Sequence, residues 1–454
     1  MNYSVENKRV LVVGAARSGI STMEVLKSLG ATVVLNDIKT KDQLGPLYEE
    51  LKEMSDELIL GIHPEDMTAF DLVVVSPGVP TDLPFILNAK ASGVEVIGEL
   101  ELAYQNCKGL FTGITGTNGK TTTTSLVGAI YKQAQKPHFV VGNIGLPAIS
   151  QALKATDKTT MVTELSSFQL ESIKTFRPQV AAVLNLTPDH LNRHKTMKAY
   201  VDAKCRIFEN QAATDILLLN YDNEPTRALK ERASSKVVYF SRKERLEEGI
   251  FVEDENIVIV DNDKKITVGA VADIFVPGPH NLENVLAAVG LAYYGGIDVK
   301  DIMDAVKTFK GVEHRVEFVD VVEGITFFND SKGTNPDASI QAVRAMNSPT
   351  ILIAGGMDKG SDFNGLIEAF GPEIKEMVLI GETKDIIEET AKAHGFTAVT
   401  KVETLAEAVD KSFELAEEGY NVLLSPACAS WDMYESYEIR GNEFKDLVRS
   451  RMSQ

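Results

Sequence analysis

The sequence predicts an α/β protein of three domains, each built on a largely parallel sheet with flanking helices. Short apolar runs bounded by turn residues alternate with segments of helical period along all 454 residues, which is the pattern of βαβ units. A chain of this length, with 44% hydrophobic residues, exceeds what one core usually organises. From the spacing of the apolar runs we place the domains at 1–98, 99–310 and 311–454.

The apolar runs give the expected positions of the strands. In the first domain we expect a helix at 18–29 and strands at 9–13, 32–36 and 71–75. In the second domain we expect a hairpin about residues 261–265, a helix after His280, and strands at 110–115, 160–164, 180–184 and 215–219. In the third domain we expect helices between strands at 326–329, 350–354, 377–380 and 422–424.

Charge and cysteine content narrow the class of protein. The formal net charge is -19, and an acidic surface repels phosphate polymers and anionic lipids, so we expect no nucleic-acid partner and no membrane insertion. Residues 1–14 lack the basic segment and apolar run of a secretory signal, and no later apolar stretch approaches ~18 residues. Cys107, Cys205 and Cys428 lie far apart, which favours reduced thiols over a disulfide framework. We therefore expect a cytoplasmic protein.

The clearest motif is residues 113–121, GITGTNGKT, between an apolar strand and a helix expected to begin near Lys120. Glycine lets backbone N–H groups close around phosphate oxygens, and the helix N-terminus adds a favourable dipole. Lys120 supplies positive charge to the outer phosphates, and Thr121 offers a hydroxyl to Mg²⁺. Ile114 replaces the first glycine of the general pattern, and an ordinary glycine-rich turn is the alternative. The predicted nucleoside triphosphate site consists of Gly116, Thr117, Asn118, Gly119, Lys120, Thr121 and Thr122.

A second glycine turn, GAARSG at 14–19, follows the first strand and opens a helix, as a dinucleotide-binding turn does. Ala16 replaces the middle glycine that permits close approach of a pyrophosphate. Asp37 ends the next strand, and Gly78 follows another strand at the same edge of the sheet. These residues fit a nucleotide diphosphate group and a helix-packing turn about equally well.

Carboxylate and imidazole groups follow two strands of the second domain. Glu164 stands at the carboxyl end of its strand, where open α/β sheets place their ligands, so it is a candidate magnesium ligand. The segment NLTPDH ends the next strand and would bring His190 near the same crevice. His190 and His194 are four residues apart, but Leu191 stands where a zinc hydrolase helix needs glutamate, so zinc is not expected. A capping or packing role is the alternative for His190.

Three further candidates are ambiguous from the residues alone. Lys204 lies in a helical segment, and its composition favours a solvated surface charge. Asn281 and Asn284 fall on one helical face, where amides suit an adenine or its phosphates, although Asn281 would serve equally well as an N-cap. Arg315 follows the second domain boundary and would stabilise charge on a transferred phosphoryl group, with an exposed surface arginine as the alternative.

Polar loops follow three strands of the third domain, at 329–336 (NDSKGTNP), 355–360 (GGMDKG) and 425–432 (SPACASWD). Because the carboxyl ends of parallel strands share one sheet edge, we expect these loops to converge. The side chains placed to hold a small anionic substrate there are Thr334, Lys359 and Ser430.

Together these motifs resemble the Mur ligase family, in order along almost the whole chain. The matching blocks are GTNGKT, ELSSFQLE, the DH pair, HNLEN, the HR pair, NDSKGTN, and SPACASWD followed by RGNEF. The last two blocks are most similar to the members of the family that add D-glutamate, and the Asn-Pro-Arg signature of members that add diamino acids is missing. The resemblance implies a Rossmann-like UDP-sugar domain, a P-loop ATPase domain, and a Rossmann-like domain that binds an amino acid and closes over the site.

The resemblance also assigns roles to individual residues. It implies that, besides the phosphate loop, the nucleotide is contacted by Asn281, Asn284, Arg315 and Asp330. It implies two Mg²⁺ ions, held by Thr121, Glu164, His190 and Lys204, the last as a carbamate. It implies contacts to the UDP-sugar substrate from Arg17, Ser18, Asp37, Gly78, Asn143 and His190, and contacts to the amino acid from Lys332, Thr334, Lys359, Ser430 and Tyr437. In this sequence Asp358 directly precedes Lys359, where some relatives place the acid one residue earlier.

The implied reaction joins D-glutamate to UDP-N-acetylmuramoyl-L-alanine in peptidoglycan precursor synthesis. It uses ATP and an acyl-phosphate intermediate, and the protein is expected to act as a monomer. The residues expected to carry the chemistry are Lys120, His190, Lys204, Arg315 and Lys332, with His190 orienting or deprotonating the amine. The alternatives are a sister ligase with another amino acid or glycan acceptor, and a nucleotide-binding regulator that has kept the scaffold.

Overall fold

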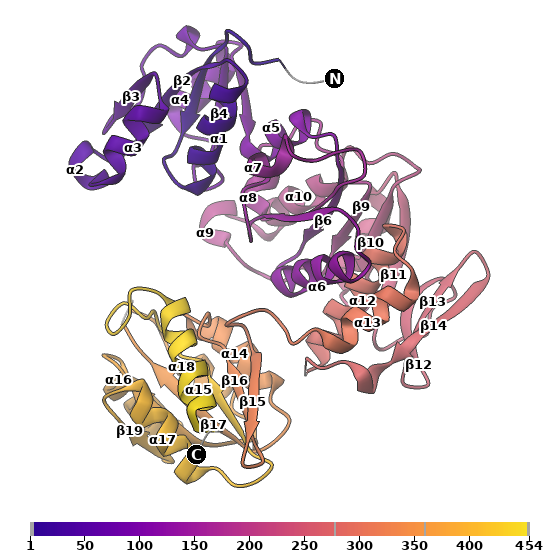
Figure 1. Ribbon diagram of the computed structural model, residues 1–454, viewed down its shortest axis with the longest axis vertical. Coiled ribbons are helices and arrows are strands. Elements are labelled where there is room, and N and C mark those ends of the chain that lie inside the picture. The colour runs from indigo at the N-terminus through magenta and orange to yellow at the C-terminus, as the bar shows by residue number, and fades with distance from the viewer. Residues whose placement is uncertain (1–3, 277, 358–359, 452–454) are drawn as a thin grey trace. The chain divides into compact units, whose positions relative to one another are not determined.

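The computed structural model describes residues 4–276, 278–357 and 360–451. This part of the chain contains three sheets, of five, nine and six strands (Figure 1). The chain divides into two compact units, one formed by Met1–Val271 and Glu283–Ala305 and the other by Ala272–Leu282 and Val306–Gln454. The first two sheets belong to the first unit, and the third sheet belongs to the second. The predicted α/β architecture is confirmed.

The first sheet has the strand order β3-β2-β1-β4-β5 and is parallel throughout. Its strands are β1 (Arg9–Val13), β2 (Thr32–Asp37), β3 (Glu57–Leu60), β4 (Leu72–Val75) and β5 (Glu95–Gly98). Its helices are α1 (Arg17–Ser28), α2 (Lys41–Leu44), α3 (Leu47–Met54), α4 (Pro84–Ala91) and α5 (Glu99–Asn106), with the 3₁₀ turn η1 (Met67–Ala69). Alternate residues of β1 join apolar clusters on opposite faces, Val10 and Val12 on one and Leu11 and Val13 on the other. Burial on both faces explains the continuous apolar run.

The second sheet has the order β14-β13-β12-β11-β10-β9-β6-β8-β7, and β10, β9 and β6 run side by side in Figure 1. Its strands are β6 (Leu110–Thr115), β7 (His138–Gly142), β8 (Thr160–Glu164), β9 (Val180–Val183), β10 (Ile216–Asn220), β11 (Lys236–Ser241), β12 (Gly249–Glu253), β13 (Asn256–Asp261) and β14 (Lys264–Ala270). The predicted hairpin is confirmed: β13 and β14 pair antiparallel. Its turn residues Asn262 and Asp263 have φ of 49° and 61°, as the tight turns that match strand twist require.

Helices connect the strands of this sheet. They are α6 (Lys120–Gln133), α7 (Ala148–Ala152), α8 (Ser167–Leu170), α9 (Leu191–His194), α10 (Met197–Cys205), α11 (Glu224–Arg227), α12 (Pro279–Tyr294) and α13 (Val299–Thr308). The 3₁₀ turns are η2 (Arg206–Phe208), η3 (Ala228–Arg232) and η4 (Val271–Asp273). None of the helices in the described ranges is long and apolar enough to cross a membrane.

The third sheet has the order β15-β16-β20-β17-β18-β19. Its strands are β15 (Glu317–Val322), β16 (Ile325–Asn329), β17 (Thr350–Gly355), β18 (Ile374–Ile380), β19 (Val399–Lys401) and β20 (Asn421–Leu424). Its helices are α14 (Pro336–Ala345), α15 (Asn364–Glu368), α16 (Lys384–Ala393), α17 (Leu405–Leu415) and α18 (Tyr437–Arg451). β15 pairs antiparallel with β16, and β16, β20, β17, β18 and β19 pair in parallel. β20 therefore lies between β16 and β17, and the carboxyl ends of these three strands share one edge.

A buried carboxyl group begins α5. Glu99 is 2% exposed, and its Oε1 accepts a hydrogen bond from the Ile149 N–H at 2.7 Å. Burial raises the pKa of Glu99 to about 7, although hydrogen bonds from the Ile149 and Ala148 backbone act in the opposite direction. The folded chain therefore retains a proton at pH values where the unfolded chain has lost it.

We expect the Glu99→Gln variant to change how stability depends on pH. Between pH 4.5 and 7 the folded wild type binds more protons than the unfolded chain, so its free energy of unfolding falls as pH rises. Relative to Glu99→Gln, which cannot titrate, the wild type should lose roughly 3 kcal/mol across this window. Urea unfolding at pH 5 and pH 8 measures the difference, with the exposed Glu50→Gln as control. Parallel pH profiles for wild type and Glu99→Gln would contradict the prediction.

Candidate functional site

Three strand ends meet around the phosphate loop. β6 lies between β8 and β9, with Ile114 paired to Glu164 and Thr115 paired to Val183. After β6 the chain forms β7 and β8 on one side of it and then β9 on the other side. Open α/β sheets bind ligands at such a point, where the strand order reverses. Glu164, the phosphate loop and the segment after β9 share this edge. The structure thus brings together candidates that are about 50 and 70 residues apart in sequence.

The loop itself needs its glycines. Gly116 and Gly119 have φ of 153° and 82°, and 82° lies in the left-handed region that favours glycine. A Cβ at Gly119 would lie 2.0 Å from Oδ1 of Asn284. Asn284 is buried, and its amide thus closes one side of the loop. As predicted, α6 begins at Lys120 and the backbone N–H groups of its first turn follow the loop directly.

Lys120 and the loop hydroxyls are already engaged. The Nζ of Lys120 donates to the carbonyl oxygens of Gly116 at 3.0 Å and Thr117 at 2.7 Å. The Thr117 hydroxyl lies 3.0 Å from the hydroxyl of Tyr200. The Asn118 N–H donates to Oδ1 of Asn185 at 2.8 Å, and Nδ2 of Asn185 returns a bond to the Asn118 carbonyl at 3.1 Å. Thr121 and Thr122 are buried in the first turn of α6.

Asn185 and Tyr200 therefore shape the loop, although sequence reasoning did not single them out. Asn185 is the first polar residue of the segment NLTPDH after β9, and its place at a strand end was the available signal. Tyr200 is buried inside α10, and a tyrosine in a helix carries no local sign of such a contact. Burial raises the pKa of Tyr200 to about 12, so its hydroxyl remains a donor.

The buried carboxylate of Glu164 has one oxygen in use. Glu164 is 1% exposed, and its Oε1 accepts a hydrogen bond from Nδ2 of Asn143 at 2.8 Å. Its Oε2 is buried without a hydrogen-bond partner in the described part of the chain. An unpaired buried carboxylate oxygen is costly unless a cation or donor completes it. The oxygen therefore fits a Mg²⁺ ligand, and Asn143 fixes its orientation.

Lys204 is 2% exposed, so the interpretation as a solvated surface charge is wrong. Its Nζ donates to the Gly116 carbonyl oxygen at 2.7 Å and lies 4.8 Å from the centre of the Tyr200 ring. Burial, followed by the nearby charge of Lys120, holds the pKa of Lys204 well below its ordinary value, while Asp189 and Glu164 act in the opposite direction. Burial thus favours the neutral form of this amine beside the phosphate loop.

The two histidines of this region differ. His190 is exposed, has φ of 50°, and its Nε2 lies 3.5 Å from Oδ2 of Asp189. His194 is buried, with Nε2 at 2.9 Å from the Ser167 hydroxyl, so it packs against the protein. Over the described residues, no three His, Cys, Asp or Glu side chains gather to hold a metal ion. Mg²⁺ in this region would take further ligands from hydroxyl groups, water and phosphate oxygens, as it usually does.

At the first sheet, one close packing contact and one hydrogen bond hold the glycine turn at 14–19. A Cβ at Gly19 would lie 1.8 Å from the Gly14 carbonyl oxygen. Asp37 holds the same turn, because its Oδ2 accepts from the Ala15 N–H at 2.7 Å. Arg17, by contrast, is exposed at the start of α1 and donates from Nη2 to the Gly145 carbonyl at 3.1 Å. Gly78 is exposed, with open space where a Cβ would be.

Helix α12 carries both predicted amides. The Asn281 N–H donates to the Gly278 carbonyl at 3.0 Å, and the helix begins at Pro279. The alternative of Asn281 as an N-cap is therefore wrong, because Asn281 lies inside the first turn. Asn281 and Asn284 are both buried.

In the second unit, Asp330 directly follows β16. Its Oδ2 accepts from the Ser425 hydroxyl at 2.6 Å, and its Oδ1 accepts from the Val316 N–H at 3.2 Å. Burial raises the pKa of Asp330 to about 7, while the Ser425 hydrogen bond and the charge of Arg315 act in the opposite direction. The structure thus brings Asp330 together with Arg315 and with the start of the 425–432 loop.

Of the residues predicted to bind the amino acid, Lys332 lies near Tyr437 at the start of α18. The Nζ of Lys332 lies 5.9 Å from the centre of the Tyr437 ring. The Lys332 carbonyl accepts from the Thr334 N–H at 2.9 Å, which makes a tight turn. Ser430 is buried in the loop after β20. Lys359, together with Asp358, lies outside the described residues.

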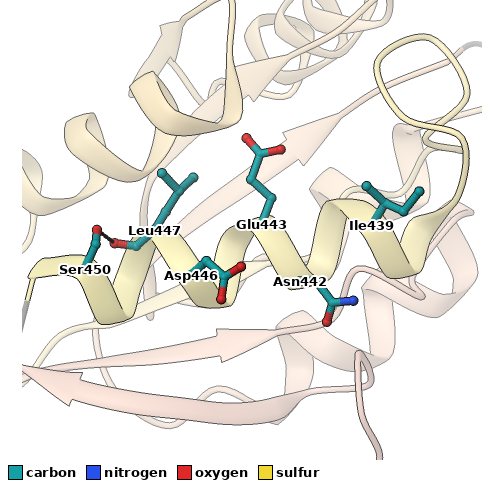
Figure 2. Close-up of a pocket in the computed structure, with 6 residues that line it drawn as sticks. All are labelled: Ile439, Asn442, Glu443, Asp446, Leu447 and Ser450. Carbon is teal, nitrogen blue, oxygen red and sulfur yellow. Dashed lines mark hydrogen bonds between the residues drawn. The ribbon is translucent and has the colours of Figure 1, made fainter.

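An open concavity of about 480 Å³ lies elsewhere, on the outer face of α18. Figure 2 shows that its lining residues are strung along this one helix. They are Ile439, Asn442, Glu443, Asp446, Leu447 and Ser450. Two of the six are carboxylates, which disfavour an anionic ligand. The concavity contains none of the predicted site residues.

A strand, a glycine loop and a helix N-terminus on a parallel sheet, beside a buried carboxylate and a buried lysine, are typical of proteins that use nucleoside triphosphates. Family models match most of the chain: the Mur ligase MurD-like N-terminal domain at residues 8–98, the Mur ligase middle domain at 114–292, and the Mur ligase glutamate ligase domain at 314–428. The chain belongs to the Mur ligase family, and the resemblance seen in the motifs is confirmed.

Close relatives cover nearly the whole chain. A UDP-N-acetylmuramoylalanine–D-glutamate ligase of Alkaliphilus oremlandii is 54% identical over 448 residues, which span 98% of this chain and 99% of the relative. A ligase of the same name from Clostridioides difficile is 52% identical over the same shares of the two chains.

Solved structures show the same fold. A UDP-N-acetylmuramate-alanine ligase of Thermotoga maritima matches with a TM-score of 0.59 at 20% identity, over 99% of this chain and 100% of the other. MurF from Acinetobacter baumannii matches with a TM-score of 0.57 at 18% identity, over 100% and 93%.

Proposed function

We propose that this protein is an ATP-dependent ligase that forms the amide bond between UDP-N-acetylmuramoyl-L-alanine and D-glutamate, as a cytoplasmic monomer in peptidoglycan precursor synthesis. The observation that carries the proposal is the 54% identity to a ligase of that name over 98% of this chain. The site chemistry supports it, because Glu164 shares a sheet edge with the phosphate loop and Lys204 of α10 contacts that loop.

ATP is assigned to the phosphate loop from Gly116 to Thr122, with Asn281, Asn284, Arg315 and Asp330 as further contacts. When ATP binds, the Nζ of Lys120 moves from its two carbonyl acceptors to the outer phosphates. Its positive charge there offsets the repulsion between the phosphates and the attacking carboxylate. Two Mg²⁺ ions are assigned to Thr121, Glu164, His190 and Lys204. When bound, Mg²⁺ neutralises charge on the phosphate oxygens. The Oε2 of Glu164 supports this assignment, because it is buried without a hydrogen-bond partner in the described part of the chain.

The remaining site residues are assigned to the two other substrates. The UDP-sugar substrate is contacted by Arg17, Ser18, Asp37, Gly78, Asn143 and His190. D-Glutamate, with two carboxylates, is held by Lys332, Thr334, Lys359, Ser430 and Tyr437.

The reaction proceeds in two displacements. A carboxylate oxygen of UDP-N-acetylmuramoyl-L-alanine attacks the γ-phosphorus of ATP, ADP leaves, and an acyl phosphate results. The neutral amine of D-glutamate attacks the acyl carbon, a proton is lost from nitrogen, and inorganic phosphate leaves with the former carboxylate oxygen. His190, exposed beside Asp189, orients or deprotonates the amine. Arg315 and Lys120 stabilise the charge on the transferring phosphoryl group.

Phosphate release by purified protein tests the proposal. The reactions contain ATP, Mg²⁺ and UDP-N-acetylmuramoyl-L-alanine with D-glutamate, L-glutamate, L-lysine, meso-diaminopimelate or no amino acid. We expect release stimulated by D-glutamate alone. Stimulation by another amino acid would replace the proposed substrate with that of a sister ligase. Tight nucleotide binding without release would show a regulator instead of a ligase.

A further inference from the structure

Arg440 of α18 is the largest fully buried side chain among the described residues, at 1% exposed. Its Nε donates to the Ser331 hydroxyl at 3.0 Å, and its Nη2 donates to the carbonyl oxygens of Ser331 at 2.9 Å and Cys428 at 3.2 Å. Its Nη1 lies 3.5 Å from the Ala429 carbonyl oxygen. One guanidinium therefore connects the loop after β16 with the loop after β20.

The third polar loop meets the same group. The Ala429 carbonyl oxygen also accepts from the Met357 N–H at 2.9 Å, in the loop after β17. A Cβ at Gly356 of that loop would lie 3.3 Å from Nη1 of Arg440. The Ser331 hydroxyl, in turn, donates to the Tyr437 carbonyl at 2.8 Å. The three loops assigned to the amino acid thus converge on a single buried side chain.

Arg440 and Lys445 are both buried cations of α18, but their hydrogen-bond partners differ. Over the described chain, every hydrogen-bond acceptor of Arg440 is a main-chain or hydroxyl oxygen. Lys445, also buried on α18, pairs with the carboxylates of Glu313 and Glu317 at 2.5 and 3.4 Å. Burial lowers the pKa of Arg440 to about 10. The groups that act on this pKa in the opposite direction are Cys428, Asp432, Tyr434 and Asp330. A buried charge is costly to maintain. The buried charge of Arg440 is hydrogen-bonded to the loops after β16 and β20, and so holds them together.

A lysine at position 440 could not make the hydrogen bonds that Arg440 makes. Arginine presents five donors in a rigid planar fork, whereas lysine is a compact point charge with rotatable donors. The four contacts of Arg440 use three different nitrogens of that fork. The carboxylate of Asp330 takes its hydrogen bonds from Ser425 and Val316, and none of these four Arg440 contacts reaches it. Loss of the Arg440 guanidinium should therefore disturb the loops assigned to the amino acid more than it disturbs Asp330, which is assigned to the nucleotide.

We propose that Arg440 is a positioning residue for the amino-acid subsite: it holds the loops at Ser331 and Cys428–Ala429 in the arrangement in which Lys332 and Ser430 bind the carboxylates of D-glutamate. The inference rests on the proposed function. It assigns no contact with the substrate to Arg440, which acts through the loop backbone.

Steady-state kinetics of the full-length chain test the inference. We expect Arg440→Gln to raise KM for D-glutamate by at least ~10-fold while KM for ATP changes by less than ~2-fold. Arg440→Lys should give an intermediate KM, because it keeps the charge but not the fork. Arg449→Gln, an exposed arginine of the same helix, is the matched control. Lys445→Gln, which breaks a buried ion pair on α18, controls for general destabilisation.

The outcomes separate the inference from the function. Equal rises in KM for ATP and D-glutamate, or the same kinetic change in Lys445→Gln, would show a general structural role and overturn it. So would an unchanged KM for D-glutamate in variants of an active wild type. If Arg440→Gln does not fold, Arg440→Lys decides by the same criterion. A wild type that D-glutamate does not stimulate would overturn the proposed function, and the inference with it.

Discussion

Lys120→Ala is expected to reduce ATP-dependent phosphate release by at least about 10³-fold at saturating substrates. The Nζ of Lys120 rests on two carbonyl oxygens of its own loop, at 3.0 and 2.7 Å. Phosphate oxygens offer this ammonium group charged acceptors, and hydrogen bonds between charged groups are roughly twice as strong as neutral ones. Removal of the ammonium group leaves the charge of the transferring phosphoryl group uncompensated. Loss of kcat with retained folding is the expected signature.

The matched control is Lys132→Ala, at the other end of the same helix, where the side chain is exposed. It should keep wild-type phosphate release within about twofold, since surface substitutions away from a site have small effects. Phosphate release by Lys120→Ala within tenfold of wild type would contradict the assignment of the 116–122 loop to the outer phosphates.

Lys204→Arg is expected to reduce phosphate release by at least about 10²-fold, although it keeps a positive charge. Lys204 is buried beside the loop, and burial favours its neutral amine. We expect this amine to add to the carbon of CO₂ and lose a proton, which yields the carbamate proposed above as a Mg²⁺ ligand. Arginine does not lose its proton in proteins and forms no such ligand.

A ¹³C NMR spectrum of the protein in ¹³C-bicarbonate provides an independent readout. We expect a carbamate resonance in the wild type that is absent from Lys204→Arg. Lys198→Arg, on the exposed face of the same helix with 86% of its side chain exposed, should retain both the resonance and the activity. Full activity of Lys204→Arg would show that Lys204 serves as a cation on the Gly116 carbonyl.

The sequence predicted the parts of the fold that have strong local signals. The run LFTGIT matches β6 residue for residue and is buried after the exposed Leu110, and GTNGKT leads to a helix at Lys120. The segments ELIL and EVIG, which form β3 and β5, were missed because a glutamate begins each of them, EVIG has only two apolar residues before its glycine, and ELIL is only partly buried. Short strands of this kind are stabilised by their neighbours in the sheet.

The positions of candidate site residues could be predicted where a strand end or a motif placed them. Glu164 and Asp330 follow this rule, because the end of a parallel strand is a defined edge in space. Lys204 could not be distinguished from a surface lysine by composition, since its burial depends on the packing of α10 against the loop. Arg440 and Asn185 were not identified as candidates, because their hydrogen-bond partners lie up to 109 residues away in the sequence.

The proposed reaction is tested most directly by following ¹⁸O from the substrate carboxylate. Purified protein is incubated with ATP, Mg²⁺, D-glutamate and UDP-N-acetylmuramoyl-L-alanine, the last with both oxygens of its carboxylate labelled. The ¹⁸O content of each product is measured by mass spectrometry. We predict a D-glutamyl amide that retains one label and inorganic phosphate that carries the other, because phosphate leaves with the oxygen that attacked ATP. Unlabelled phosphate, or release of phosphate without amide formation, would contradict the proposal.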